Sequence, residues 1–226
     1  MGAPSLSPRS PGAAGPDDGF QGPKRGADRA VLLAHGAGAD MHAAALTTVA
    51  DALAGARVPS LRFDFPYRLA GRRAPDRPPV LLAAVRDAAA ELARRAKVPP
   101  ERLVLGGRSM GGRIASMVAA ADVDGIPALG LTLLGYPLHP PGKPDRLRVE
   151  HFPALTMPVL FVSGTRDAFG TPEELQRHAK KIKGAVEFSW IETGDHSFKP
   201  LKASGLSAAD ALAEVAGAVV DFVCRL

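Results

Sequence analysis

The chain has 226 residues, of which 46% are hydrophobic and 23% charged, and its formal net charge at pH 7 is +5. This length can bury one sizeable core, and the single cysteine excludes an internal disulfide. No apolar run of about 18 residues could span a membrane, and the dispersed arginines, without a basic block or interleaved aromatics, argue against a nucleic-acid partner.

The chain begins with a segment rich in proline, glycine and serine over residues 1–28, which holds almost no aliphatic side chains. Such a segment cannot bury enough apolar surface to offset the entropy of ordering its backbone, so we predict a disordered tail. It lacks the charged and then apolar order of a secretory signal, which makes the cytoplasm the default expectation. Residues 29–226 are predicted to form one domain.

From Ala30 onward, short runs of leucine or β-branched residues alternate with longer alanine-rich segments. That alternation predicts an α/β fold with an open, doubly wound, mostly parallel sheet flanked by helices. Six strands are expected, at residues 30–34, 61–65, 103–106, 129–134, 159–163 and 186–191. Helices are expected at residues 41–54 and 80–97, and from about residues 109, 171 and 208.

A glycine-rich motif lies at residues 107–111, where Gly-Arg-Ser-Met-Gly matches G-x-S-x-G between a predicted strand and a predicted helix. There a tight turn pushes the central serine out at the carboxyl edge of the sheet, and larger side chains at the two glycine positions would collide with neighbouring elements. We therefore predict that Ser109 is a nucleophile. The alternative is a turn that only packs tightly. A phosphate-binding loop is excluded because Gly112-Arg113 stands where that motif needs lysine and then serine or threonine.

A serine hydroxyl becomes a good nucleophile only beside an imidazole that takes its proton and a carboxylate that orients the imidazole. Asp167 follows the predicted strand at residues 159–163, and His196 follows the strand that ends near Ile191. Ligands of open α/β sheets bind at the carboxyl ends of the strands, so we predict a catalytic triad of Ser109, Asp167 and His196. Taken singly, Asp167 fits a turn aspartate and His196 a surface histidine. Asp195 is a second candidate for the acid, ranked below Asp167 because sequence neighbours on an extended loop point apart.

An acyl-transfer site also needs amide donors that face the developing oxyanion. We predict that one donor is the N–H of Met110, the residue after the serine. The second is predicted to be the N–H of Ala37, within the His-Gly-Ala-Gly segment at residues 35–38 that follows the first strand. A simple flexible turn is the alternative for this segment.

Aromatic residues near the strand ends are candidate walls of a substrate pocket, and we predict that Tyr67, Tyr136 and Phe169 bind substrate. Nearby arginines leave open an anionic acyl or leaving group, with surface solvation as the alternative: they are Arg68, Arg108, Arg113 and Arg166. The proline-rich stretch of about 20 residues before the strand at 159–163 leaves no room for a helical cap. An open site favours small or soluble esters.

Several stretches together resemble the α/β-hydrolases related to dienelactone hydrolase and esterase, and especially a bacterial branch of uncharacterised hydrolases. They are LAHGAGADM (33–41), RFDFPYR (62–68), GGRSMGGR (106–113), LLGYPLHPPGKP (133–144), EHFP (150–153) and LFVSGTRDAFG (160–170). The resemblance implies the fold and a serine hydrolase mechanism, and it maps nucleophile, acid and base onto Ser109, Asp167 and His196. Dienelactone hydrolases themselves use a cysteine nucleophile, which the motif here lacks, so their substrate is not carried over.

The sequence therefore predicts a serine esterase that acts on a small-molecule ester and needs neither a cofactor nor a metal. Relatives in this branch include eukaryotic subunits of chromatin-associated complexes, which implies that some members act as scaffolds without turnover. A non-catalytic scaffold or partner-binding protein is accordingly the alternative function.

Overall fold

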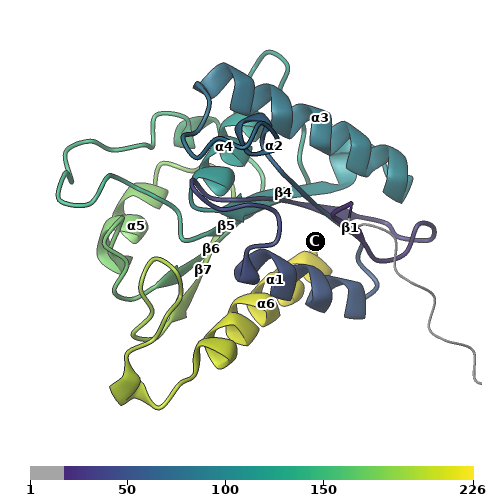
Figure 1. Ribbon diagram of the computed structural model, residues 1–226. Coiled ribbons are helices and arrows are strands. Elements are labelled where there is room, and N and C mark those ends of the chain that lie inside the picture. The colour runs from purple at the N-terminus through teal and green to yellow at the C-terminus, as the bar shows by residue number, and fades with distance from the viewer. Residues whose placement is uncertain (1–17) are drawn as a thin grey trace, which may run out of the picture.

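The computed structural model describes residues 18–226, which form a seven-stranded sheet with helices on both faces (Figure 1). The strands are β1 (Phe20–Gln21), β2 (Ala30–Ala34), β3 (Ser60–Phe63), β4 (Leu103–Arg108), β5 (Gly130–Leu134), β6 (Val159–Gly164) and β7 (Val186–Ile191). The α-helices are α1 (Ala44–Gly55), α2 (Pro66–Leu69), α3 (Pro78–Ala96), α4 (Met110–Ala119), α5 (Pro172–Ala179) and α6 (Ala208–Arg225). Short 3₁₀ helices lie at Pro100–Arg102, Phe152–Ala154 and Lys202–Ser204.

The predicted open, mostly parallel sheet is confirmed, with the strand order β1-β3-β2-β4-β5-β6-β7. All six expected strands are present, and the seventh, β1, pairs antiparallel with β3. This strand lies inside the segment predicted to be a disordered tail, where the Arg95 guanidinium also stacks over the Phe20 ring at 4.3 Å. Residues 18–28 of that segment are described, whereas residues 1–17 lie outside the described residues, so the disorder of residues 1–17 stays a prediction.

Each central strand contributes side chains to two separate cores, because successive residues of a strand point to opposite faces. On β2, Leu32 packs into the core beneath α3, α4 and α5, whereas Val31 and Leu33 pack into the core beneath α1 and α6. Figure 1 shows α3 and α4 on one side of the sheet and α1 and α6 on the other. All of β2 is buried, which explains why its sequence is a continuous apolar run.

The sheet has a point between β2 and β4 where the direction of strand addition reverses. From β2 the chain adds β3 on one side and then returns to add β4 on the other. The helices that follow these two strands, α1 and α4, consequently lie on opposite faces and leave a crevice between their connecting loops. This crevice is where the structure places the candidate site.

The helices near the site begin at residues that the sequence signals locally. Thr171 and Ser207 form capping boxes at the starts of α5 and α6, in which each side chain accepts from the third backbone N–H of its helix. The first helix begins at Ala44, three residues later than predicted, because the N–H of Met41 is held by the Asp64 carboxylate outside the helix. Within residues 18–226, no helix combines the length and the hydropathy that a membrane-spanning segment needs.

Candidate active site

The predicted nucleophile lies on a strained turn between β4 and α4. Ser109 has φ 51° and ψ −118°, a conformation that non-glycine residues rarely adopt. Its backbone N–H donates to Leu134 O at 2.8 Å, which fixes the turn against β5. A Cβ atom at Gly107 or at Gly111 would lie 2.1 or 2.2 Å from Ala34 O, so the turn fits against β2 only if both positions are glycine.

The structure brings Ser109, His196 and Asp167 into one hydrogen-bonded chain. The Ser109 Oγ lies 2.9 Å from His196 Nε2, and His196 Nδ1 lies 2.8 Å from Asp167 Oδ2. Because an ionised carboxylate only accepts, Nδ1 carries the proton and Nε2 is free to accept from the serine hydroxyl. Asp167 is 2% exposed, and its other carboxylate oxygen accepts from the Phe169 N–H at 2.8 Å. This arrangement can remove the serine proton as the oxygen attacks a carbonyl.

Two loops at neighbouring strand ends carry the predicted acid and the predicted base. The loop after β6 and the loop after β7 are joined by the bond from Arg166 N to Gly194 O at 2.9 Å, and by that from Thr193 N to Thr165 Oγ1 at 2.9 Å. Asp195, the second candidate for the acid, instead caps its own loop, with its Oδ1 accepting from the N–H groups two and four residues on.

The segment after β2 is held by a buried histidine. His35 Nδ1 lies 2.8 Å from Gly36 O, and its Nε2 accepts from the Phe65 N–H at 3.1 Å. Burial lowers the pKa of His35, which keeps the ring neutral with its proton on Nδ1. The Gly36 carbonyl also accepts from the Ala39 N–H, and because the peptide is planar and trans, the Ala37 N–H points the opposite way. Ala37 lines the cavity beside Ser109.

A cavity of about 360 Å³ opens in front of the serine. Its lining residues are Ala37, Arg108, Ser109, Met110, Arg113, Pro137, Arg148, Phe169 and His196. Both predicted oxyanion donors, Met110 and Ala37, are therefore at this cavity, as is the predicted wall residue Phe169. The Phe169 ring stacks on the His196 imidazole with centroids 4.0 Å apart, so it also limits the movement of that imidazole.

The other two predicted wall residues are core residues, which corrects the prediction. Tyr67 is fully buried and packs edge-on against the His35 ring at 5.8 Å. Tyr136 is 1% exposed, and its hydroxyl donates to Arg148 O at 2.6 Å. Both lie near strand ends, as expected, but their rings point into the core beneath α3, α4 and α5.

The sequence of residues 27–224 matches a family described as an alpha/beta hydrolase domain. The chain belongs to this family. Solved structures with the same fold include Est1E from Butyrivibrio proteoclasticus with ferulic acid bound, which has 18% identity and a TM-score of 0.69 over 91% of this chain and 93% of that one. A dienelactone hydrolase from Anabaena variabilis has 20% identity and a TM-score of 0.65 over 88% and 87%. A monoacylglycerol lipase from Paleococcus ferrophilus has 17% identity and a TM-score of 0.65 over 91% and 97%.

The cavity of this α/β-hydrolase also holds arginines, two of which the sequence suggested and one of which it missed. Arg108 is the last residue of β4 and Arg113 lies in the first turn of α4, but Arg148 comes from the irregular segment between β5 and β6. No motif or spacing marks Arg148, because the loop that carries it is placed only by the folded sheet. Arg68 and Arg166, the other two arginines considered, do not line this cavity among residues 18–226.

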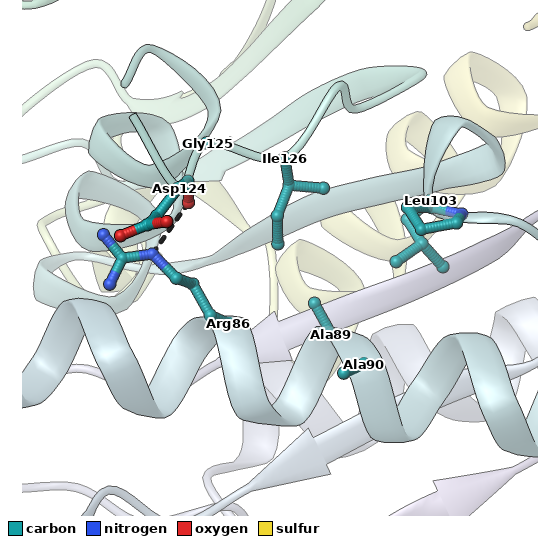
Figure 2. A pocket seen from close by; sticks show the side chains of 8 residues that line it. Arg86, Ala89, Ala90, Leu103, Asp124, Gly125 and Ile126 are labelled. Carbon is teal, nitrogen blue, oxygen red and sulfur yellow. Dashed lines mark hydrogen bonds between the residues drawn. The ribbon is translucent and has the colours of Figure 1, made fainter. Parts of the chain in front are cut away.

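A second cavity, of about 320 Å³, lies between α3 and the segment that precedes β5 (Figure 2). Figure 2 shows Arg86 and Asp124 at one end and the apolar side chains of Ala89, Ile126 and Leu103 along the rest. The Arg86 guanidinium donates to Asp124 O at 2.8 Å. Among residues 18–226, the lining of this second cavity contains no serine, cysteine or histidine.

Proposed function

We propose that this protein is a serine hydrolase that cleaves small or soluble esters through Ser109, His196 and Asp167. The observation that carries the proposal is the hydrogen-bonded chain from Asp167 to the Ser109 Oγ, which ends on a strained turn at an accessible cavity. Backbone strain of this kind persists where the surrounding structure requires it, and it clusters at active sites.

In the proposed reaction, the Ser109 Oγ attacks the ester carbonyl while its proton passes to His196 Nε2. Asp167 stabilises the imidazolium through the bond to Nδ1 and stays ionised. Collapse of the tetrahedral intermediate breaks the bond to the leaving alkoxide, which takes the proton from Nε2. Water, deprotonated by the same nitrogen, then cleaves the acyl-enzyme, and the proton returns to the Ser109 Oγ.

The oxyanion of each tetrahedral intermediate is proposed to lie between the N–H groups of Met110 and Ala37. Met110 is the first residue of α4, where backbone N–H groups have no partner within the helix and the helix dipole favours negative charge. The Ala37 N–H is oriented through the Gly36 carbonyl, which His35 holds from the opposite side. Each such donor contributes about 10²- to 10³-fold to kcat in acyl-transfer enzymes.

Small or soluble esters are favoured by the surroundings of the cavity. Residues 135–158, which connect β5 to β6, contain a single 3₁₀ turn at Phe152–Ala154. A helical cap that would cover long acyl chains is therefore absent from this connection. The proposed substrate class comes from this geometry, since the solved relatives are too distant in sequence to indicate more than the fold.

The test is hydrolysis of p-nitrophenyl acetate and butyrate by the purified protein beside two variants. Ser109→Ala removes the proposed nucleophile, and Ser204→Ala, at an exposed serine outside the cavity, is the matched control. We expect kcat to fall by about 10⁴- to 10⁶-fold in the first variant and to stay unchanged in the second. A fluorophosphonate probe, located by mass spectrometry, should label the peptide that contains Ser109.

A non-catalytic scaffold is the competing function. Equal rates in the wild type and Ser109→Ala, with no label on a protein that circular dichroism shows to be folded, would refute the esterase proposal and favour the scaffold. The same protein would then be used to search for a stable partner.

A further inference from the structure

The cavity at the proposed nucleophile carries three guanidinium groups and no carboxylate on its lining. Arg108 comes from the end of β4, Arg113 from the first turn of α4, and Arg148 from the segment between β5 and β6. An arginine side chain keeps its charge in proteins, so a wall of this composition is strongly positive.

Arg108 is already engaged with the loop that carries the proposed base. Its Nη2 donates to His196 O at 3.0 Å and to Ser197 Oγ at 3.0 Å. Although burial lowers the pKa of Arg108, the charges of Asp167 and Asp195 act in the opposite direction. Arg108 therefore has counter-charges and hydrogen-bond acceptors without a ligand.

Arg113 and Arg148 lack comparable counter-charges and hydrogen-bond acceptors among residues 18–226. Neither forms an ion pair with a carboxylate in the described part of the chain, and the buried Nε of Arg113 has no hydrogen-bond partner. The Arg148 guanidinium reaches only Pro137 O, at 3.5 Å, and both burial and the charge of Arg113 lower its pKa. The acidic residue nearest in sequence, Glu150, is exposed, and its charge acts on His151 and Tyr136.

The backbone of both arginines is held by a buried polar network. The Tyr136 hydroxyl donates to Arg148 O at 2.6 Å, and the Ser116 hydroxyl donates to Arg113 O at 2.8 Å. Ser116 Oγ lies 2.8 Å from His151 Nε2. Because the Ser116 proton is used on Arg113 O, His151 donates to Ser116 Oγ. The backbone of the two arginines is thus held by neutral groups, and no carboxylate among the described residues forms an ion pair with their side chains.

We propose that the cavity selects esters that bear an anionic group, which Arg113 and Arg148 bind while Ser109 attacks the ester carbonyl. This inference rests on the proposed function and names its substrate class. The guanidinium fork pairs with carboxylate and phosphate oxygens through charge-assisted bonds, which are stronger than neutral ones. Two cations that repel each other in a partly buried wall gain most from such a ligand, since it supplies the missing counter-charge.

The experiment compares matched charged and neutral esters. The charged substrates are the mono-p-nitrophenyl esters of succinate, glutarate and adipate, and each has a neutral counterpart in which the free carboxylate is a methyl ester. Spontaneous hydrolysis is measured without enzyme and subtracted. A second pair, acetoxybenzoate and its methyl ester, places the charge on the leaving group. We expect kcat/KM to be at least about tenfold higher for the charged member of one pair, which is about 1.4 kcal/mol. The pair that shows it identifies the side of the ester that carries the anion.

Variants then assign the preference to the two arginines. Arg148→Gln and Arg113→Gln should each lower the charged-to-neutral ratio of kcat/KM by about 10- to 100-fold, the effect of losing a hydrogen bond between charged groups. Arg148→Glu should invert the preference. Arg148 is suited to substitution because the bond from Tyr136 uses its backbone oxygen. The matched control is Arg86→Gln, which removes the same charge at the other cavity and should leave the ratio unchanged.

Measurements on the wild type alone provide a second test. The preference should fall as NaCl is raised, because salt screens the attraction. Succinate and inorganic phosphate should act as competitive inhibitors, and the tighter one distinguishes a carboxylate from a phosphate ligand. Equal kcat/KM within every pair, with p-nitrophenyl acetate still hydrolysed and Ser109 still labelled, would overturn this inference and leave the proposed function standing. If the wild type neither hydrolysed p-nitrophenyl acetate nor was labelled at Ser109, the proposed function itself would be refuted.

Discussion

The strained turn at Ser109 is predicted to require glycine at position 111. This can be tested by making the same glycine-to-alanine change at Gly111 and at Gly217, a second glycine within a helix. Gly111 is the second residue of α4, and a Cβ there would lie 2.2 Å from Ala34 O and 2.6 Å from His35 O. Gly217 lies in the exposed face of α6, and a Cβ there meets nothing within 4 Å. Replacing glycine by alanine within a helix stabilises it by about 1 kcal/mol when the methyl group has room.

The expected effects therefore have opposite signs. In Gly111→Ala, the Ala34 carbonyl would have to move by about 1 Å to restore van der Waals contact, and because the opposing atoms are backbone, no side-chain rotation can relieve the overlap. Overpacking of this kind costs about 1–3 kcal/mol, and more when the site is rigid. We expect a net loss of about 2 kcal/mol or more, with a Tm lower by about 4–8 °C. Gly217→Ala should gain about 0.5–1 kcal/mol.

Urea unfolding gives the free energy of unfolding of each variant. It can be followed by far-UV circular dichroism and by fluorescence, which reports on one site because Trp190 is the only tryptophan. Esterase activity on p-nitrophenyl acetate gives the consequence for the turn, and kcat should fall in Gly111→Ala alone. If Gly111→Ala were as stable and active as the wild type, or if Gly217→Ala were the less stable variant, the turn at Ser109 would not require glycine at position 111.

Further predictions concern the proposed acid Asp167, the histidine after β2, and the partly buried His151 that bonds to Ser116. Asp167→Asn should lower kcat by about 10³- to 10⁴-fold because the amide favours the wrong imidazole tautomer, as steady-state kinetics would show. His35→Phe should lower kcat by about 10²-fold and stability by about 1–3 kcal/mol, since it removes one of the two donors to the Gly36 carbonyl and leaves the Phe65 N–H without its acceptor. Full retention of both kcat and stability would contradict the role of His35. Burial lowers the pKa of His151 to about 4, so below about pH 6.5 the unfolded chain binds a proton that the native chain does not. Stability should therefore fall by up to about 3 kcal/mol as the pH drops from about 6.5 to 4, and urea titrations should show a shallower fall in His151→Gln.

The parallel sheet could be predicted because its strands are apolar runs of defined length, and the positions of Ser109, Asp167 and His196 followed from the ends of those runs. The short strand β1 was not predicted because its stability comes from pairing with a strand that is distant in the sequence. β1 forms by pairing with the edge of β3, and nothing in the glycine-rich segment around it signals a strand.

The direction in which a side chain points was the second feature that the sequence could not predict. Proximity to a strand end correctly suggested that Phe169 lies at the cavity, but it could not show that Tyr67 and Tyr136 turn into the core. Arg148 lies in an irregular loop, where no periodicity relates a residue to a face of the fold.

The order of the site residues along the chain has a consequence for biosynthesis. Ser109 lies on the turn after β4, whereas the proposed acid and base lie on the loops after β6 and β7. Helix α6 follows them along the chain and covers one face of the sheet. During synthesis, which proceeds from the N-terminus, the nucleophile is present long before its partners, and a parallel sheet closes only after distant segments have met. The proposed mechanism therefore implies that a nascent chain stays inert until the loop after β7 and α6 have emerged, and that the onset of hydrolysis would time the completion of this fold.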